Sequence, residues 1–97
     1  MTHTLNDGRI ANIECTRQGC STRCLGIPAK DLKIGDKIMW NGGGHSTVEA
    51  IEFSKTGKTM VIKERSNYDG KLYDRKLGNI ENRGMVILEN GKYAYIK

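Results

Sequence analysis

The chain has 97 residues, enough for one compact domain. Its apolar content of 37% suits a small core and argues against a deep pocket for a bulky cofactor. No apolar run approaches the roughly 18 residues that span a bilayer, and the first ten residues lack a signal-peptide pattern, so we expect a cytoplasmic protein. The formal net charge is +5, and all of the excess lies in residues 55–97, which hold ten Lys and Arg against five acids. A one-sided basic surface attracts polyanions, although solubility alone also accounts for a few units of charge.

Residues 1–26 are rich in Thr, Asn, Arg, Gly and Cys, and no apolar periodicity holds there for more than a few positions. We therefore expect an irregular, Cys-containing N-terminal arm. Pro28 disfavours the α conformation at Ile27 and marks a boundary. The chain is predicted to divide into this arm and a β domain over residues 27–97, which begins with a single turn at Ala29.

From Gly35 onward, short strands alternate with tight turns. The predicted strands are residues 36–40, 46–54, 59–65, 71–77, 85–88 and 93–96. The second of them switches its apolar face near Ala50, which indicates a β-bulge. Asp69-Gly70 is the clearest turn, because both residues tolerate the positive φ of a tight hairpin. Short strands at this spacing, with no long helix, predict an all-β fold of five to six antiparallel strands that close into a small barrel.

The opening Leu32-Lys33-Ile34-Gly35-Asp36-Lys37-Ile38 resembles the start of SH3-like barrels of the KOW and Tudor type. Together with Trp40-Asn41-Gly42 and Ser54-Lys55-Thr56-Gly57-Lys58, it also resembles small uncharacterised proteins of phages and other mobile elements of Gram-positive bacteria. The resemblance covers residues 27–88 and implies an SH3-like barrel. A similar opening occurs in intein-type splicing domains. Their Thr-x-x-His block and C-terminal His-Asn pair are missing, so we do not expect splicing.

Three cysteines, Cys15, Cys20 and Cys24, lie within ten residues. One interpretation is a tetrahedral zinc site with His3 or His45 as the fourth ligand. The spacing differs from that of paired Cys-x2-Cys knuckles, and an odd count argues against a self-contained disulfide framework. The alternatives are a regulatory or intermolecular disulfide, or three reduced thiols. We expect the reduced thiols and predict no cofactor.

Aromatic and basic side chains interleave in the second half of the chain. Nucleobases stack on exposed aromatic rings, and Lys and Arg neutralise phosphates. Tyr73 and Arg75 share one face of a predicted strand by period-two alternation, so that surface would present a ring and a guanidinium together. The alternative is that the aromatics belong to the core. The candidate contacts for nucleic acid or another partner are Trp40, Lys63, Arg65, Lys71, Tyr73, Arg75, Lys76 and Arg83.

No nucleophile, base and orienting group can be placed together in the sequence, so we do not expect an enzyme. The residues favour a small non-enzymatic module that binds nucleic acid or a ribonucleoprotein through a basic β face. The resemblance to phage proteins implies an alternative, an anti-CRISPR-like inhibitor that binds a large host defence nuclease by protein–protein contact. Both functions place the protein in the cytoplasm of a bacterial host.

Overall fold

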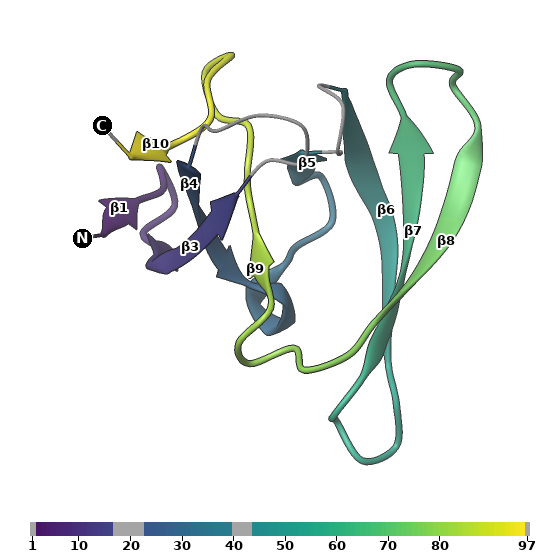
Figure 1. Ribbon diagram of the computed structural model, residues 1–97. Helices are drawn as coiled ribbons and strands as arrows, with labels where there is room; N and C mark the ends of the chain where they lie inside the picture. The colour runs from purple at the N-terminus through teal and green to yellow at the C-terminus, as the bar shows by residue number, and fades with distance from the viewer. Residues whose placement is uncertain (1, 17–22, 40–43, 97) are drawn as a thin grey trace.

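A computed structural model describes residues 2–16, 23–39 and 44–96, and it confirms the predicted all-β fold (Figure 1). A single 3-10 turn, η1 (Ala29–Asp31), lies at the predicted position. Among the described residues, no helix has the length and apolar character that a membrane crossing requires. The strands are β1 (His3–Thr4), β2 (Ile10–Ala11), β3 (Ile13–Thr16), β4 (Arg23–Pro28), β5 (Lys37–Met39), β6 (His45–Phe53), β7 (Met60–Ser66), β8 (Leu72–Leu77), β9 (Gly84–Met85) and β10 (Tyr95–Ile96).

The larger sheet is an antiparallel meander in the order β5-β6-β7-β8. The β6–β7 and β7–β8 hairpins turn at Gly57 and Gly70, whose φ values are +71° and +70°. The register between β6 and β7 shifts between Val48 and Ala50, which confirms the predicted bulge. A bulge bends the strand that carries it and increases its twist, and β6 runs beside β7 to the hairpin that joins them (Figure 1).

The second sheet is built around β4, which pairs with β3 and β10 and, at its end, with β9. Here the structure differs from the predicted irregular arm, because β1, β2, β3 and the start of β4 all lie within residues 1–26. Cys24, Leu25 and Ile27 of β4 are all buried. A strand buried on both faces reads as a continuous apolar run instead of an alternation, and this explains why periodicity did not reveal it.

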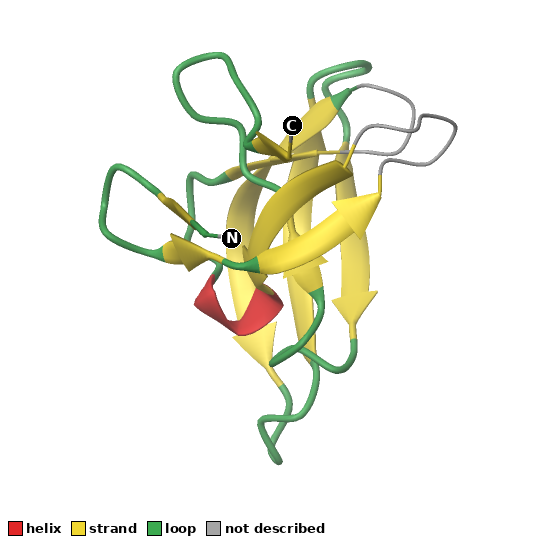
Figure 2. Cartoon of the chain, turned by 60° about the vertical axis from the view of Figure 1, so that its left-hand side comes forward, coloured by secondary structure: helices red, strands yellow, loops and turns green. Residues whose placement is uncertain are grey.

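β1 and β2 form a separate two-stranded sheet. The two four-stranded sheets face each other without forming the closed barrel that the sequence predicts (Figure 2). The described strands also exceed the five to six expected, because the structure contains additional strands of only two residues, which are too short to leave a pattern in the sequence. Contact between the sheets runs through the segment after β9: Ile87 bridges Ile38, the Val86 carbonyl accepts from the Met39 amide at 2.9 Å, and the Leu88 amide donates to Lys37. These bonds join β5 to the segment that follows β9.

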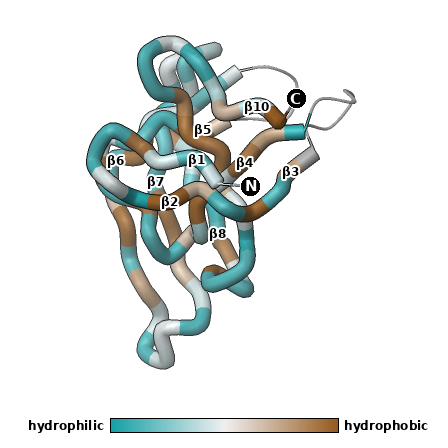
Figure 3. The backbone as a smooth tube through the Cα atoms, turned by 90° about the vertical axis from the view of Figure 1, so that its left-hand side faces the viewer, coloured by the Kyte–Doolittle hydropathy of each residue, from teal (hydrophilic) through white to brown (hydrophobic). Residues whose placement is uncertain are grey.

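The core fills the space between the sheets. The burial of β7 alternates residue by residue, with Met60 and Ile62 inside and Val61 outside, as predicted. Apolar colour follows the strands, while the turns between them are mostly hydrophilic (Figure 3). The largest fully buried apolar side chains are Ile27, Ile38, Met60, Ile62, Leu77 and Val48.

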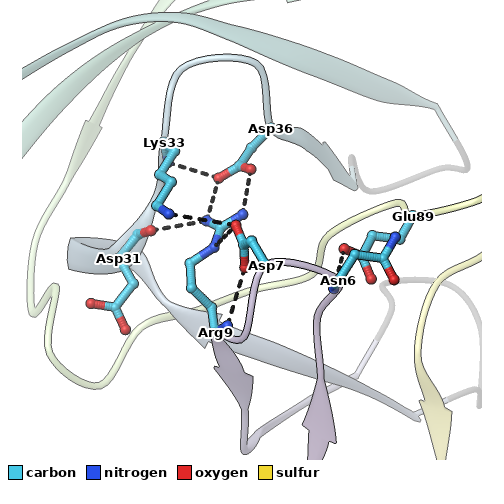
Figure 4. Close-up of polar contacts among 7 residues, drawn as sticks. All are labelled: Asn6, Asp7, Arg9, Asp31, Lys33, Asp36 and Glu89. Carbon is cyan, nitrogen blue, oxygen red and sulfur yellow. Dashed lines mark hydrogen bonds and ion pairs between the residues drawn. The ribbon is translucent and has the colours of Figure 1, made fainter.

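A polar contact fastens the β1–β2 hairpin to the loop before β5 (Figure 4). The Arg9 guanidinium donates two 2.7 Å bonds to the carboxylate of Asp36 and one of 2.9 Å to the backbone oxygen of Asp31. Its Nε donates to Asp7 at 2.8 Å. The pKa of Arg9 is raised, chiefly by the hydrogen bonds to Asp36. This nearly buried, bidentate ion pair holds the β1–β2 hairpin against the loop before β5. The Asn6 amide, which donates to Glu89 at 2.8 Å, and the contact of Asp7 with Lys33 at 3.6 Å hold it further (Figure 4).

Candidate nucleic-acid interface

The predicted basic residues of β7 and β8 divide between two faces of the meander sheet. Directly opposed residues of an antiparallel pair project from the same face. Lys76 is opposite Val61, whose neighbours on the same face are Lys63 and Arg65. Tyr73 and Arg75 lie opposite Glu64 and Ile62 on the other face, so their predicted common face is confirmed. A single surface carrying all of these side chains is therefore not formed.

On the outer face, two of the predicted cations are paired with acids. Lys63 lies 3.8 Å from Asp74. Arg65 donates to both carboxylate oxygens of Glu49, at 2.5 and 3.2 Å, and to the Gly70 carbonyl at 2.8 Å. The hydrogen bonds from Arg65 lower the pKa of Glu49, and those to Glu49 raise the pKa of Arg65. A phosphate would have to displace these partners.

On the inner face, Arg75 neutralises a buried acid. Its Nη2 lies 2.8 Å from Oε1 of Glu64, whose side chain is 2% exposed, while Arg75 is 29% exposed. An uncompensated charge at Glu64 would be costly. Arg75 therefore has a structural partner that the sequence prediction of a phosphate contact did not consider.

Tyr73 and Lys71 shape the β7–β8 turn. The Tyr73 hydroxyl donates to the carboxylate of Asp69, and the Lys71 amide donates to the same carboxylate at 2.8 Å. The hydrogen bond from Tyr73 is the main reason why the pKa of Asp69 is lowered, and it also raises the pKa of Tyr73. The Lys71 ammonium is exposed at the tip of this hairpin, at the opposite end of the sheet from the β6–β7 hairpin (Figure 1).

Exposed cations gather at the end of the molecule that holds the β6–β7 hairpin. The Lys30 amide donates to the Ile80 carbonyl, and the Arg83 amide donates to Asn79, so both residues flank the turn over residues 79–82. We call the following set the basic end; each side chain is exposed and makes no ion pair with another described residue: Lys30, Lys55, Lys58, Lys76 and Arg83.

A groove of about 630 Å³ opens at the basic end, between the β6–β7 hairpin and the turn before β9. Residues 56–59 line one side, and Asn79, Ile80 and Glu81 line the other. The hairpin is fixed by a 2.9 Å bond from the Ser54 amide to the Thr59 carbonyl. A cation, Lys58, and an acid, Glu81, thus meet at the same groove.

Of the predicted contacts, Lys76 and Arg83 belong to the basic end. Sequence reasoning missed Lys30, Lys55 and Lys58. The motif over residues 54–58 was used only as evidence for the fold. Its two lysines, Lys55 and Lys58, flank the turn at Thr56-Gly57, where they lie outside the paired strands. Trp40 lies outside the described residues.

The described residues offer no metal centre. Cys15 and Cys24 are opposed on β3 and β4, while His3 and His45 belong to two other sheets. Across residues 2–16, 23–39 and 44–96, no three His, Cys, Asp or Glu side chains are grouped to hold a metal ion. Cys20, the third predicted zinc ligand, lies outside these ranges.

Comparison with protein-family models, with curated proteins and with solved structures finds no match for this chain.

Proposed function

We propose that the protein is a small non-enzymatic module that binds nucleic acid or a ribonucleoprotein at its basic end. The observation that carries this proposal is that five exposed cations gather there with no acid partner among the described residues, whereas Lys63, Arg65 and Arg75 are engaged in ion pairs. Phosphate contacts dominate the affinity of proteins for nucleic acids, and a cation without a competing carboxylate makes them at the lowest cost. Asp31, Glu52 and Glu81 lie at the same end and leave it a net charge of +2.

We also propose that the fold is an incompletely closed relative of the SH3-like barrels. Two features support this: the meander from β5 to β8, and the return of the segment after β9 to β5 through Ile38 and Ile87. In such an arrangement the loops at one end of the sheet share a surface, as the β6–β7 hairpin and the turn at Asn79 do here. Function still has to be argued from the site, because this architecture serves many partners.

The test is direct binding of fluorescently labelled single-stranded and duplex oligonucleotides, followed by anisotropy at about 50 mM salt. We expect Lys58→Gln combined with Arg83→Gln to weaken binding by roughly tenfold or more. The matched control is Lys71→Gln combined with Lys92→Gln. It removes the same charge from the two hairpins at the opposite end of the molecule (Figure 1) and should leave affinity nearly unchanged.

A third variant tests the opposite change in charge. Glu81→Gln removes the acid from the groove, and we expect it to strengthen binding by about two- to fivefold. Unchanged melting temperatures would show that the variants are folded. The proposal fails if neither oligonucleotide binds, or if the control weakens binding as much as the pair at the basic end.

A protein partner is the second candidate. Tyr68 is 90% exposed, and Val61 and Leu72 remain partly exposed on the otherwise charged outer face. Exposed aromatic and aliphatic groups of this kind are typical of protein contacts. This surface would suit the inhibitor of a host defence nuclease. Tyr68→Ala should weaken the affinity for a protein partner that binds through this surface. That affinity should depend only weakly on salt concentration, in contrast to the affinity for nucleic acid.

A further inference from the structure

Two cysteines lie directly across from each other in the β4 sheet. β3 and β4 are antiparallel, and the register pairs Cys15 with Cys24 between the pairs Glu14–Leu25 and Thr16–Arg23. Opposed residues project from the same face of a sheet, so the two side chains are neighbours. Cys24 is completely buried, whereas Cys15 is only partly buried.

The spacing of such a pair suits a disulfide. Opposed Cα atoms in an antiparallel ladder lie about 4.5–5.5 Å apart, within the range of about 4.4–6.8 Å that disulfides span. The Cβ atoms of opposed residues are about 4.5–5.5 Å apart, slightly more than the roughly 3.8 Å that disulfides prefer. The two ranges meet at about 4.5 Å, so a small shift of the strands is enough for the bond to form. Disulfides that are strained or accessible are the ones that thiols reduce readily.

We propose that Cys15 and Cys24 form a reversible cross-strand disulfide, with Cys15 as the attacking thiol and Cys24 as the resolving thiol. The oxidant is a small disulfide such as oxidised glutathione. The Cys15 thiolate attacks one of its sulfurs, forms a mixed disulfide and releases one glutathione thiolate. The Cys24 thiolate then attacks Cys15 Sγ and releases the second glutathione. Two protein thiols lose two protons and two electrons, and the oxidant becomes two molecules of glutathione.

Exposure assigns the order of the two steps. A small disulfide can reach the partly exposed Cys15 from solvent, but it cannot reach Cys24, which is completely buried in the folded protein. Cys15 Sγ donates to the Ile13 carbonyl at 3.6 Å and lies against Gly84 of β9. Burial, and to a lesser extent the neighbouring Cys24, raise the pKa of Cys15. Because the thiolate is the nucleophile, oxidation should accelerate as the pH rises above neutral.

The sequence allows a clean measurement of the pairing. Trypsin cleaves after Arg9, Arg17, Arg23 and Lys30, so each of the three cysteines falls on its own peptide. The folded protein is treated with oxidised glutathione, blocked with iodoacetamide and digested without reductant. We expect the peptide 10–17 to be linked to the peptide 24–30 and to separate again after reduction.

Variants distinguish this pairing from the alternatives. In Cys20→Ser, both remaining thiols should be lost on oxidation, and the melting temperature should rise because the bond restricts the unfolded chain. Cys24→Ser in the same Cys20→Ser background should stop at the glutathione adduct of Cys15. The proposal is overturned if the main linkage involves Cys20, if the Cys20→Ser protein yields only glutathione adducts, or if it yields only intermolecular dimers. Each of these readouts is independent of nucleic-acid binding.

Discussion

Arg9 shows how a single side chain can connect parts of the chain that the sequence does not relate. Its guanidinium meets Asp36, 27 positions along the chain, with both side chains largely buried. Gly35 and Asp36 belong to the opening that resembles SH3-like barrels. The partner of the Asp36 carboxylate was not predicted, because a long-range ion pair leaves no local pattern. Only the placement of the β1–β2 hairpin brings Arg9 to this loop.

We expect Arg9→Ala to lower the free energy of unfolding by about 2–4 kcal/mol, because it leaves the Asp36 carboxylate with little solvent and without its bidentate partner. Urea denaturation followed by circular dichroism measures this loss. Arg9→Lys keeps the charge without the fork of donors and should recover only part of it. An Arg9→Ala protein as stable as the parent would show that the contact is not structural.

Stability should also fall in acid. The side-chain hydrogen bond from Arg9 lowers the pKa of Asp7 from 3.8 to about 2. A carboxyl group whose pKa is depressed in the folded state stabilises the fold above its ordinary pKa, and this contribution is lost as the pH falls from about 4 to about 2. Glu49 and Asp69 act in the same direction. Asp7→Asn should therefore reduce, without abolishing, the loss of unfolding free energy between about pH 4 and pH 2. An unchanged pH dependence would show that Asp7 does not contribute to stability in this way.

At the scale of strands, the sequence predicted β5 to β8 to within one residue of their bounds. Those strands are marked by local patterns in the sequence. Apolar and polar residues alternate, as in the burial of Met60 and Ile62, and the turns use residues that tolerate a positive φ, such as Gly70. The bulge near Ala50 was predicted for the same reason. β1 to β3 were not, because their strands are short and contribute few side chains to the core. The apolar run of β4 was the signal that could have revealed a buried strand in this region.

Gly26 is required by the packing of β4 against β9. A Cβ atom at this position would lie 2.8 Å from the backbone nitrogen of Met85, and backbone cannot easily retreat. We expect Gly26→Ala to destabilise the protein by about 1–3 kcal/mol. Gly78→Ala is the matched control, since a Cβ there meets nothing within 4 Å, and it should change stability by less than about 0.5 kcal/mol. Equal midpoints for the two variants in urea would contradict this packing.

At the scale of the whole molecule, the sequence predicted where the basic charge lies along the chain and not which cations are available. The ion pair between Arg65 and Glu49 depends on the register beside the bulge, and that between Arg75 and Glu64 depends on a charged residue at an inward position of β7. Glu64 follows Met60 and Ile62 at period two, so its burial could have been anticipated. The gathering of Lys58 and Arg83 at one end could not, because it depends on the packing of the two sheets.

The slope of log Kd against log salt concentration, measured by oligonucleotide anisotropy, tests the central claim most directly. Each phosphate neutralised by a cation contributes about 0.9 to this slope on duplex DNA. If the basic end binds nucleic acid, Lys58→Gln with Arg83→Gln should reduce the slope by about 1.8, and Lys71→Gln with Lys92→Gln should leave it unchanged. Equal slopes for the parent and the variant at the basic end would contradict the account.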